Sequence, residues 1–196
     1  MPHFRFLKKE VRIIGWDDGP FFKGDKTVPI FGAIFRGGFW MDGLLSTRIR
    51  VDGNDATKKI FTSINNARHR EQLRIIMLDG ITLGGFNVVD IERLHKETNM
   101  AVIAISRKMP DFSKIKRALT NLKDGDEKWA LIEKCGAPLE TKINGRSIYY
   151  QTCGINRKGA EDVIKLSSTR ALIPEPLRVA HLIASGVAKG ESYGRA

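Results

Sequence analysis

The sequence predicts an α/β fold in which helices cover both faces of a mixed five-stranded sheet, with three antiparallel strands followed by two parallel ones. Three β-type stretches follow one another between residues 11 and 51, with no helical pattern between them. Helical and strand patterns then alternate from residue 54 to residue 106, which is typical of parallel pairing. Beyond Pro110 the apolar periodicity is mostly helical.

The first strand is expected over residues 11–17, V-R-I-I-G-W-D, which are rich in β-forming side chains and end at the turn signal D-D-G-P. Residues 28–36 and 44–51 have the same character, and each is bounded by Gly or Asp-Gly. Because nothing between these stretches can form a helix, we expect an antiparallel meander.

The next part of the chain alternates between a helix over residues 54–68, a buried strand over 73–78, a helix over 88–96 and a buried strand over 101–106. Right-handed crossovers would place the fourth strand next to the first, which is the ribonuclease H-like arrangement. A doubly wound Rossmann sheet needs a helix after the first strand and a G-x-G-x-x-G turn, and the sequence has neither.

The last part of the chain is expected to be helical, with a short strand or hairpin near residues 143–153. The expected helices cover residues 114–122, 127–135, 159–167 and 176–189. Proline is tolerated at the first helical position, where its missing N–H would be unpaired anyway, so Pro176 is predicted to be residue N1 of the last helix.

The composition indicates a basic protein that forms one domain over residues 1–196. Lys and Arg number 33 against 22 Asp and Glu, and this net charge of +11 favours polyanionic partners such as nucleic acid, although an unspecialised basic protein would look similar. The two cysteines form no CxxC pair or disulfide pattern, which indicates a reducing compartment and no zinc site. The charged start and the lack of roughly 18 consecutive apolar residues predict a soluble cytoplasmic protein without a signal peptide.

Carboxylates stand at the ends of two strands that should be neighbours. Asp17, followed by Asp18, ends the first strand, and Asp79 ends the fourth. Side chains alternate along a strand, so only one of the two consecutive aspartates can face Asp79, and Asp17 is the candidate. Carboxylates on adjacent strand ends can share one divalent ion, and Mg²⁺ suits oxygen ligands. The simpler reading is that each Asp only marks a turn.

Other residues at this edge of the sheet are weaker candidates. Asp52 follows the third strand and could join a metal site only if that strand bends or ends early, while Asp55 could cap the helix after it. Gly80 is the first glycine of the stretch D-G-I-T-L-G-G-F-N at 79–87, which could admit a phosphate backbone or could simply be a flexible loop. Arg107 and Lys108 follow the fifth strand and could contact a phosphate.

His181 lies early in the last helix, beside an apolar stripe formed by Leu177, Ala180, Ala184 and Val187. A histidine in this position is expected to be half-buried. It is either a packed structural side chain or a ligand that the helix brings to a site elsewhere in the fold.

Several of these stretches together resemble the endonuclease V family and, more closely, its uncharacterised archaeal relatives. The resemblance rests on G-W-D at 15–17, L-D-G at 78–80, V-I-A-I-S-R-K at 102–108 and P-E-P-L-R-V-A-H at 174–181. It implies that His181 completes a metal centre. The family carries a glutamate on the third strand where this chain has Ile49, and isoleucine cannot bind a metal.

From the residues and the resemblance we expect a nucleic-acid phosphodiesterase that depends on Mg²⁺ or Mn²⁺. In this hypothesis Asp17 and Asp79 hold the ion, and His181 binds or orients a second ion or a water. One alternative is a nucleic-acid-binding protein that retains the nuclease fold but has lost efficient cleavage together with the third-strand glutamate. Another is a regulator that binds a metal or a nucleotide.

Overall fold

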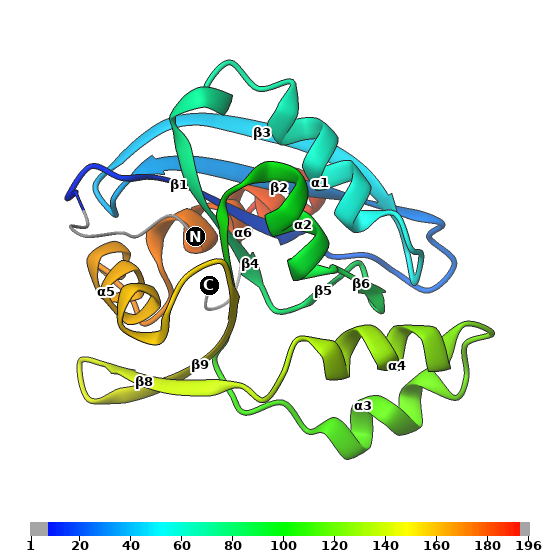
Figure 1. Ribbon diagram of the computed structural model, residues 1–196. Helices are drawn as coiled ribbons and strands as arrows, with labels where there is room; N and C mark the ends of the chain where they lie inside the picture. The colour runs from blue at the N-terminus through cyan, green and yellow to red at the C-terminus, as the bar shows by residue number, and fades with distance from the viewer. Residues whose placement is uncertain (1–7, 193–196) are drawn as a thin grey trace.

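The computed structural model describes residues 8–192 of the chain, and its main feature is a twisted seven-stranded sheet (Figure 1). The strands of this sheet are β1 (Arg12–Asp18), β2 (Thr27–Arg36), β3 (Trp40–Arg50), β4 (Leu73–Asp79), β7 (Ala101–Ser106), β8 (Leu139–Ile143) and β9 (Arg146–Cys153). Their order is β3-β2-β1-β4-β7-β9-β8. Two short strands, β5 (Thr82–Leu83) and β6 (Asn87–Val88), form a separate ribbon.

The predicted meander and the predicted parallel pairs are both confirmed. Strand β1 pairs antiparallel with β2, and β2 with β3, whereas β1, β4 and β7 lie parallel to one another. The predicted number of five strands is too low, because the hairpin expected near residues 143–153 adds two strands, β8 and β9, to the sheet. Strand β9 pairs antiparallel with β7, and Asn144 and Gly145, both at positive φ, form the tight turn between β8 and β9.

The helices lie close to their expected positions. They are α1 (Ala56–Asn65), α2 (Ile91–Thr98), α3 (Phe112–Leu119), α4 (Gly125–Lys134), α5 (Arg157–Ser167) and α6 (Glu175–Lys189). The last helix begins one residue earlier than predicted, so Glu175 rather than Pro176 is N1, and Pro174 is the N-cap residue. No helix within residues 8–192 is long and apolar enough to cross a membrane. Residues 1–7, which contributed to the expectation of no signal peptide, lie outside the described part.

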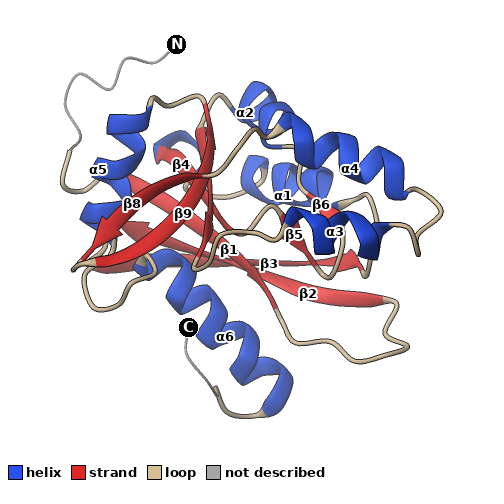
Figure 2. Ribbon diagram, turned by 90° about the horizontal axis from the view of Figure 1, so that it is seen from below, coloured by secondary structure: helices blue, strands red, loops and turns tan. Residues whose placement is uncertain are grey.

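Two apolar layers enclose the sheet, as the predicted fold class requires. On one face, Ile60 and Ile64 of α1 and Leu94 of α2 pack in the same cluster as Trp16 of β1. On the other face, α5 and the start of α6 pack against β1, β4 and β7. Figure 2 shows α6 lying along the sheet on the side away from α1. The α3–α4 pair has an apolar cluster of its own beside β6.

The contact between β1 and α6 is unusually close. A Cβ added at Gly15 would lie 2.5 Å from the carbonyl carbon of Pro176, which is shorter than real side chains permit. Glycine is therefore required where the strand meets the first turn of the helix. Farther along both elements, a Cβ at Gly19 would lie 3.6 Å from the carbonyl oxygen of Ala184. The helix therefore runs beside β1 in the same direction, past the end of the strand.

Replacing Gly15 with alanine tests this contact. We expect the Gly15→Ala variant to lose about 1–3 kcal/mol of unfolding free energy, because the added methyl group must push α6 away from β1. The matched control is Gly186→Ala in α6, where an added Cβ meets nothing within 4 Å, and this variant should be as stable as the wild type or up to about 1 kcal/mol more stable. Equal unfolding free energies for the two variants, measured in urea, would contradict the account.

Candidate metal centre

Asp17 and Asp79 lie side by side at the ends of neighbouring parallel strands. The register pairs Trp16 with Leu78, so the next residue on each strand is an aspartate. Trp16 is fully buried on the α1 side of the sheet, and alternation directs the Asp17 side chain to the α6 side. The predicted juxtaposition of these two carboxylates is present in the structure.

His181 reaches the same point from α6. Its Nδ1 lies 2.8 Å from Oδ2 of Asp17, and with the proton on Nδ1 the ring donates to the carboxylate and leaves Nε2 free. Asp17, Asp79 and His181 each offer a ligand atom, and these atoms all lie within 4.8 Å of one another. In residues 8–192 this is the group of acidic, histidine or cysteine side chains whose spacing fits a metal ion.

The buried carboxyl groups at this site repel one another, so a positive charge placed among them would be stabilising. Asp17 is only 4% exposed, and it accepts hydrogen bonds from His181 and from the backbone N–H of Asp18. Burial, together with the charge of Asp17, raises the pKa of Asp79 to about 7 and that of Asp18 to about 6. The hydrogen bond to Asp17 raises the pKa of His181. Protons therefore compensate the crowded carboxylates near neutral pH, and a divalent cation would do so better.

An open cleft of about 430 Å³ gives access to these side chains. The loop after β1, which includes Phe21, forms one wall, and Ser185 and Lys189 of α6 line it as well. We call Asp17, Asp79 and His181 the metal-type group. His181, Ser185 and Lys189 follow one another at four-residue steps, so one face of α6 lines the cleft from this group outward. The cleft is large enough for a substrate and not only for an ion.

Asp18 also lines this cleft, although alternation along β1 directs its side chain to the opposite face from that of Asp17. Its Oδ2 accepts a hydrogen bond of 3.0 Å from the backbone N–H of Gly84. Asp18 thus connects the end of β1 to the loop between β5 and β6. The signal that could have identified it was the pair of consecutive aspartates at a strand end.

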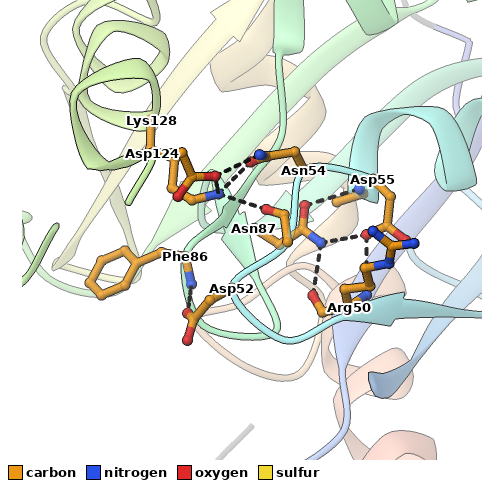
Figure 3. Close-up of polar contacts among 10 residues, drawn as sticks. Arg50, Asp52, Asn54, Asp55, Phe86, Asn87, Asp124 and Lys128 are labelled. Carbon is orange, nitrogen blue, oxygen red and sulfur yellow. Dashed lines mark hydrogen bonds and ion pairs between the residues drawn. The ribbon is translucent and has the colours of Figure 1, made fainter. Parts of the chain in front are cut away.

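The structure does not bring Asp52 into the metal-type group. Strand β3 ends at Arg50, and Asp52 adopts a positive φ in the turn that follows. Its Oδ1 accepts a hydrogen bond of 2.7 Å from the backbone N–H of Phe86 (Figure 3). The Asp55 carboxylate accepts from Arg50 N and from Asn87 Nδ2, and it makes no capping hydrogen bond to α1.

Ile49 occupies a core position in this chain. It is fully buried, lies opposite Val28 in the register of β2 and β3, and packs in the same cluster as Trp16. Its side chain therefore points to the α1 side of the sheet, away from Asp17. The third strand supplies no ligand to the metal-type group from this position.

The candidate phosphate-binding residues border the site. Arg107 is exposed, and its charge acts on both Asp79 and His181 by lowering their pKa values. Lys108 is exposed beside it. Gly80, at a φ of 80°, turns the chain immediately after Asp79, and its N–H donates to the carbonyl of Ile105 at 2.7 Å.

Comparisons with known sequences agree with the resemblance seen in the motifs. A family model described as endonuclease dU matches residues 9–188. A UPF0215 protein of Methanosarcina mazei is 53% identical over 192 residues, which cover 97% of each chain. A UPF0215 protein of Methanothermobacter thermautotrophicus is 48% identical over 196 residues, covering 99% of this chain and 96% of the relative. The predicted archaeal relatives are confirmed.

Solved structures show the same fold. A protein of unknown function from Archaeoglobus fulgidus superposes with a TM-score of 0.81 at 36% identity, over 90% of this chain and 97% of that chain. Endonuclease V of Ciona intestinalis, solved with a 24mer DNA containing an inosine followed by a ribo-adenosine, superposes with a TM-score of 0.60 at 12% identity, over 91% and 86% of the two chains. The predicted relation to the endonuclease V fold is confirmed.

The raised pKa values predict how stability depends on pH without a divalent ion. Asp18, Asp79 and His181 bind protons more tightly in the folded chain than in the unfolded chain, so their stabilising contribution is lost as pH rises. We therefore expect the Tm in chelator to fall between pH 4 and pH 8, and a divalent ion to restore it at pH 8. One kcal/mol corresponds to about 2–4 °C in a chain of this size.

The Asp79→Asn variant should lose the part of this pH dependence that lies around pH 7, because it lacks the carboxyl whose pKa is about 7. The control is Asp162→Asn, at an exposed position of α5, which should behave like the wild type. The same slope of Tm against pH in all three proteins would rule out a crowded carboxylate group.

Proposed function

The chain belongs to the endonuclease dU family, and from this premise and the geometry of the site we propose that it is a divalent-metal-dependent nucleic-acid phosphodiesterase. The observation that carries the proposal is the convergence of Asp17, Asp79 and His181 within 4.8 Å at an open cleft. The net charge of +11 favours a polyanionic substrate.

Asp17 and Asp79 would hold Mg²⁺ or Mn²⁺ by carboxylate oxygens, with His181 completing the set. Two carboxylates and one imidazole are a suitable donor set, and the burial and the neighbouring Asp17 charge that raise the pKa of Asp79 support a cation at this group. The bound ion would supply Lewis-acid activation of a phosphodiester and of the attacking water.

The residues of the chain itself have distinct tasks in this proposal. Asp17 fixes the ring of His181 through Nδ1, which leaves Nε2 available in the cleft as a ligand or as a proton acceptor. Arg107 and Lys108 would bind phosphate oxygens next to Asp79. Gly80, at a φ of 80°, would let the backbone of a substrate approach the turn after β4.

The substrate class follows from the family and its structural neighbours. The family name points to deoxyuridine in DNA, and the Ciona endonuclease V was solved on DNA containing inosine. We therefore propose nucleic acid with a deaminated base as the first substrate to test. DNA and RNA should be compared directly.

A second candidate function is nucleic-acid binding without efficient cleavage, and the observation that favours it is the burial of Ile49. With an apolar side chain there, the group has one carboxylate fewer than the endonuclease V pattern implies. A weaker hold on the ion would slow cleavage but leave the basic surface intact.

A cleavage assay separates these functions. We expect the wild-type chain to cut uracil- or hypoxanthine-containing strands in Mg²⁺ or Mn²⁺, and not in chelator. Asp79→Asn and His181→Ala should each lower the rate at least 10- to 100-fold, because each removes one ligand of the ion. The control is His69→Ala at a distant histidine that contacts Arg68 and Gln72, and its rate should match the wild type.

Two results would change this assignment. Salt-sensitive binding without cleavage under any metal condition would favour the binding protein. Cleavage that survives both Asp79→Asn and His181→Ala would place the active site elsewhere.

A further inference from the structure

The loop between β1 and β2, residues 19–26, borders the candidate metal centre. Its first three residues line the cleft that contains the metal-type group, and Lys189 in the last turn of α6 lines the same cleft. Figure 1 shows this loop in blue at the margin of the molecule, beyond the end of β1. A polynucleotide is much longer than the cleft, so a strand that leaves the metal-type group on this side passes over the loop.

The two consecutive phenylalanines of the loop have opposite environments. Phe21 is half-buried and packs against the apolar cluster on the α1 side of the sheet. Its ring also faces the β5–β6 turn, where a Cβ added at Gly85 would lie 3.6 Å from Cζ of Phe21. The side chain of Phe22, in contrast, is 68% exposed. Phe21 therefore anchors the loop to the fold and leaves the next aromatic ring in solvent.

Hydrogen bonds hold the backbone around Phe22 in a defined turn. Its N–H donates to Oδ2 of Asp25 at 2.8 Å, and its carbonyl accepts from the N–H of Asp25 at 3.0 Å. Gly24, at a φ of 104°, supplies the conformation that the turn requires. The carbonyl of Lys26 then accepts from the N–H of Val51 at 3.1 Å. Because the turn is already formed, a ligand that contacts Phe22 loses little affinity to ordering of the loop.

Cations surround this exposed ring along the chain. Lys23 follows Phe22 directly, Lys26 ends the loop, and both lysines are exposed. Lys189 adds a third cation where α6 lines the cleft. Bases and phosphates alternate along a nucleic-acid strand, so an aromatic ring between cations offers a partner to both.

A single exposed apolar side chain is common on proteins and needs no function by itself. Phe22 differs because a hydrogen-bonded turn holds it, lysines flank it, and the residue before it lines the cleft of the metal-type group. An apolar partner surface would have to desolvate the neighbouring lysines, whereas a single strand of nucleic acid pairs with the ring and with the charges. The surroundings of Phe22 therefore favour nucleic acid.

We propose that Phe22 stacks on an unpaired base of the strand that is bound at the metal-type group, while Lys23 and Lys26 bind the phosphates on either side of that base. The inference rests on the proposed function, because the strand must lie in the cleft for its next bases to reach the loop. A base inside a duplex is already stacked on both faces. The loop therefore selects substrates that are single-stranded beside the cleavage position.

Scanning a strand with abasic positions tests this proposal. The probes are single-stranded DNA oligonucleotides with one uracil and one abasic tetrahydrofuran analogue, which moves by one nucleotide from probe to probe. Affinity is measured in chelator by fluorescence anisotropy, and cleavage of the same strands is measured with the divalent ion. The variants are Phe22→Leu, which keeps an apolar side chain but removes the ring, and Phe22→Trp, which keeps a ring. The matched control is Phe39→Leu, at an exposed phenylalanine near the opposite end of β1 from Asp17.

We expect the abasic analogue to lower the affinity of the wild type about tenfold at one position beside the uracil, because the stacked base is missing there. Phe22→Leu should bind the intact strand about tenfold more weakly and should no longer respond to the abasic analogue at that position. Phe22→Trp should restore the response, and Phe39→Leu should keep the wild-type pattern. The Tm of each Phe22 variant should match that of the wild type, since the side chain is exposed.

The outcomes separate this inference from the proposed function. If the wild type binds and cleaves but Phe22→Leu responds to every abasic position as the wild type does, the stacking assignment is wrong and the nuclease assignment stands. If Phe22→Leu loses the response but no protein cleaves with any divalent ion, the stacking assignment stands and the nuclease assignment is wrong. If the wild type neither binds nor cleaves any of the strands, both are wrong.

Discussion

The candidate site depends on one close contact, that of Gly15 in β1 with Pro176 at the start of α6. From this point the strand advances roughly 6.6 Å over two residues to Asp17, and the helix advances roughly 7.5 Å over five residues to His181. The two side chains therefore arrive at the same level, and their hydrogen bond of 2.8 Å is a consequence of that agreement. Gly15, Pro176 and His181 together fix the position of the site, although more than 160 residues separate the glycine from the other two.

The same contact explains why carboxylates can crowd at this edge of the sheet. Parallel pairing brings Asp79 beside Asp17, and alternation turns Asp18 toward the β5–β6 loop, where the Gly84 N–H holds it. The cost of this crowding appears as raised pKa values for Asp18 and Asp79. The fold tolerates the cost because His181 supplies a compensating hydrogen bond to Asp17. A divalent ion at the group would remove the remaining repulsion.

Much of this arrangement could be predicted from the sequence, because local patterns determine which segments are strands and how parallel neighbours align. Asp17 and Asp79 are candidates because they end neighbouring strands, and His181 is a candidate because of the motif at 174–181. The tertiary contacts were not predictable in the same way. The sequence predicts a short strand or hairpin near residues 143–153, but it does not predict that β9 extends the sheet beside β7. The burial of Lys128 and the cavity beside α3 and α4 depend on how distant elements pack. Local sequence patterns do not predict such packing.

In the proposed function, one divalent ion is bound jointly by the two strand ends and α6. The most direct measurement is anomalous diffraction from crystals of the chain soaked in Mn²⁺ at a pH above 7, where Asp79 is ionised. We expect a peak bonded to a carboxylate oxygen of Asp17, a carboxylate oxygen of Asp79 and a ring nitrogen of His181. A peak that lacks either strand-end carboxylate, or no peak in this cleft at saturating Mn²⁺, would contradict it.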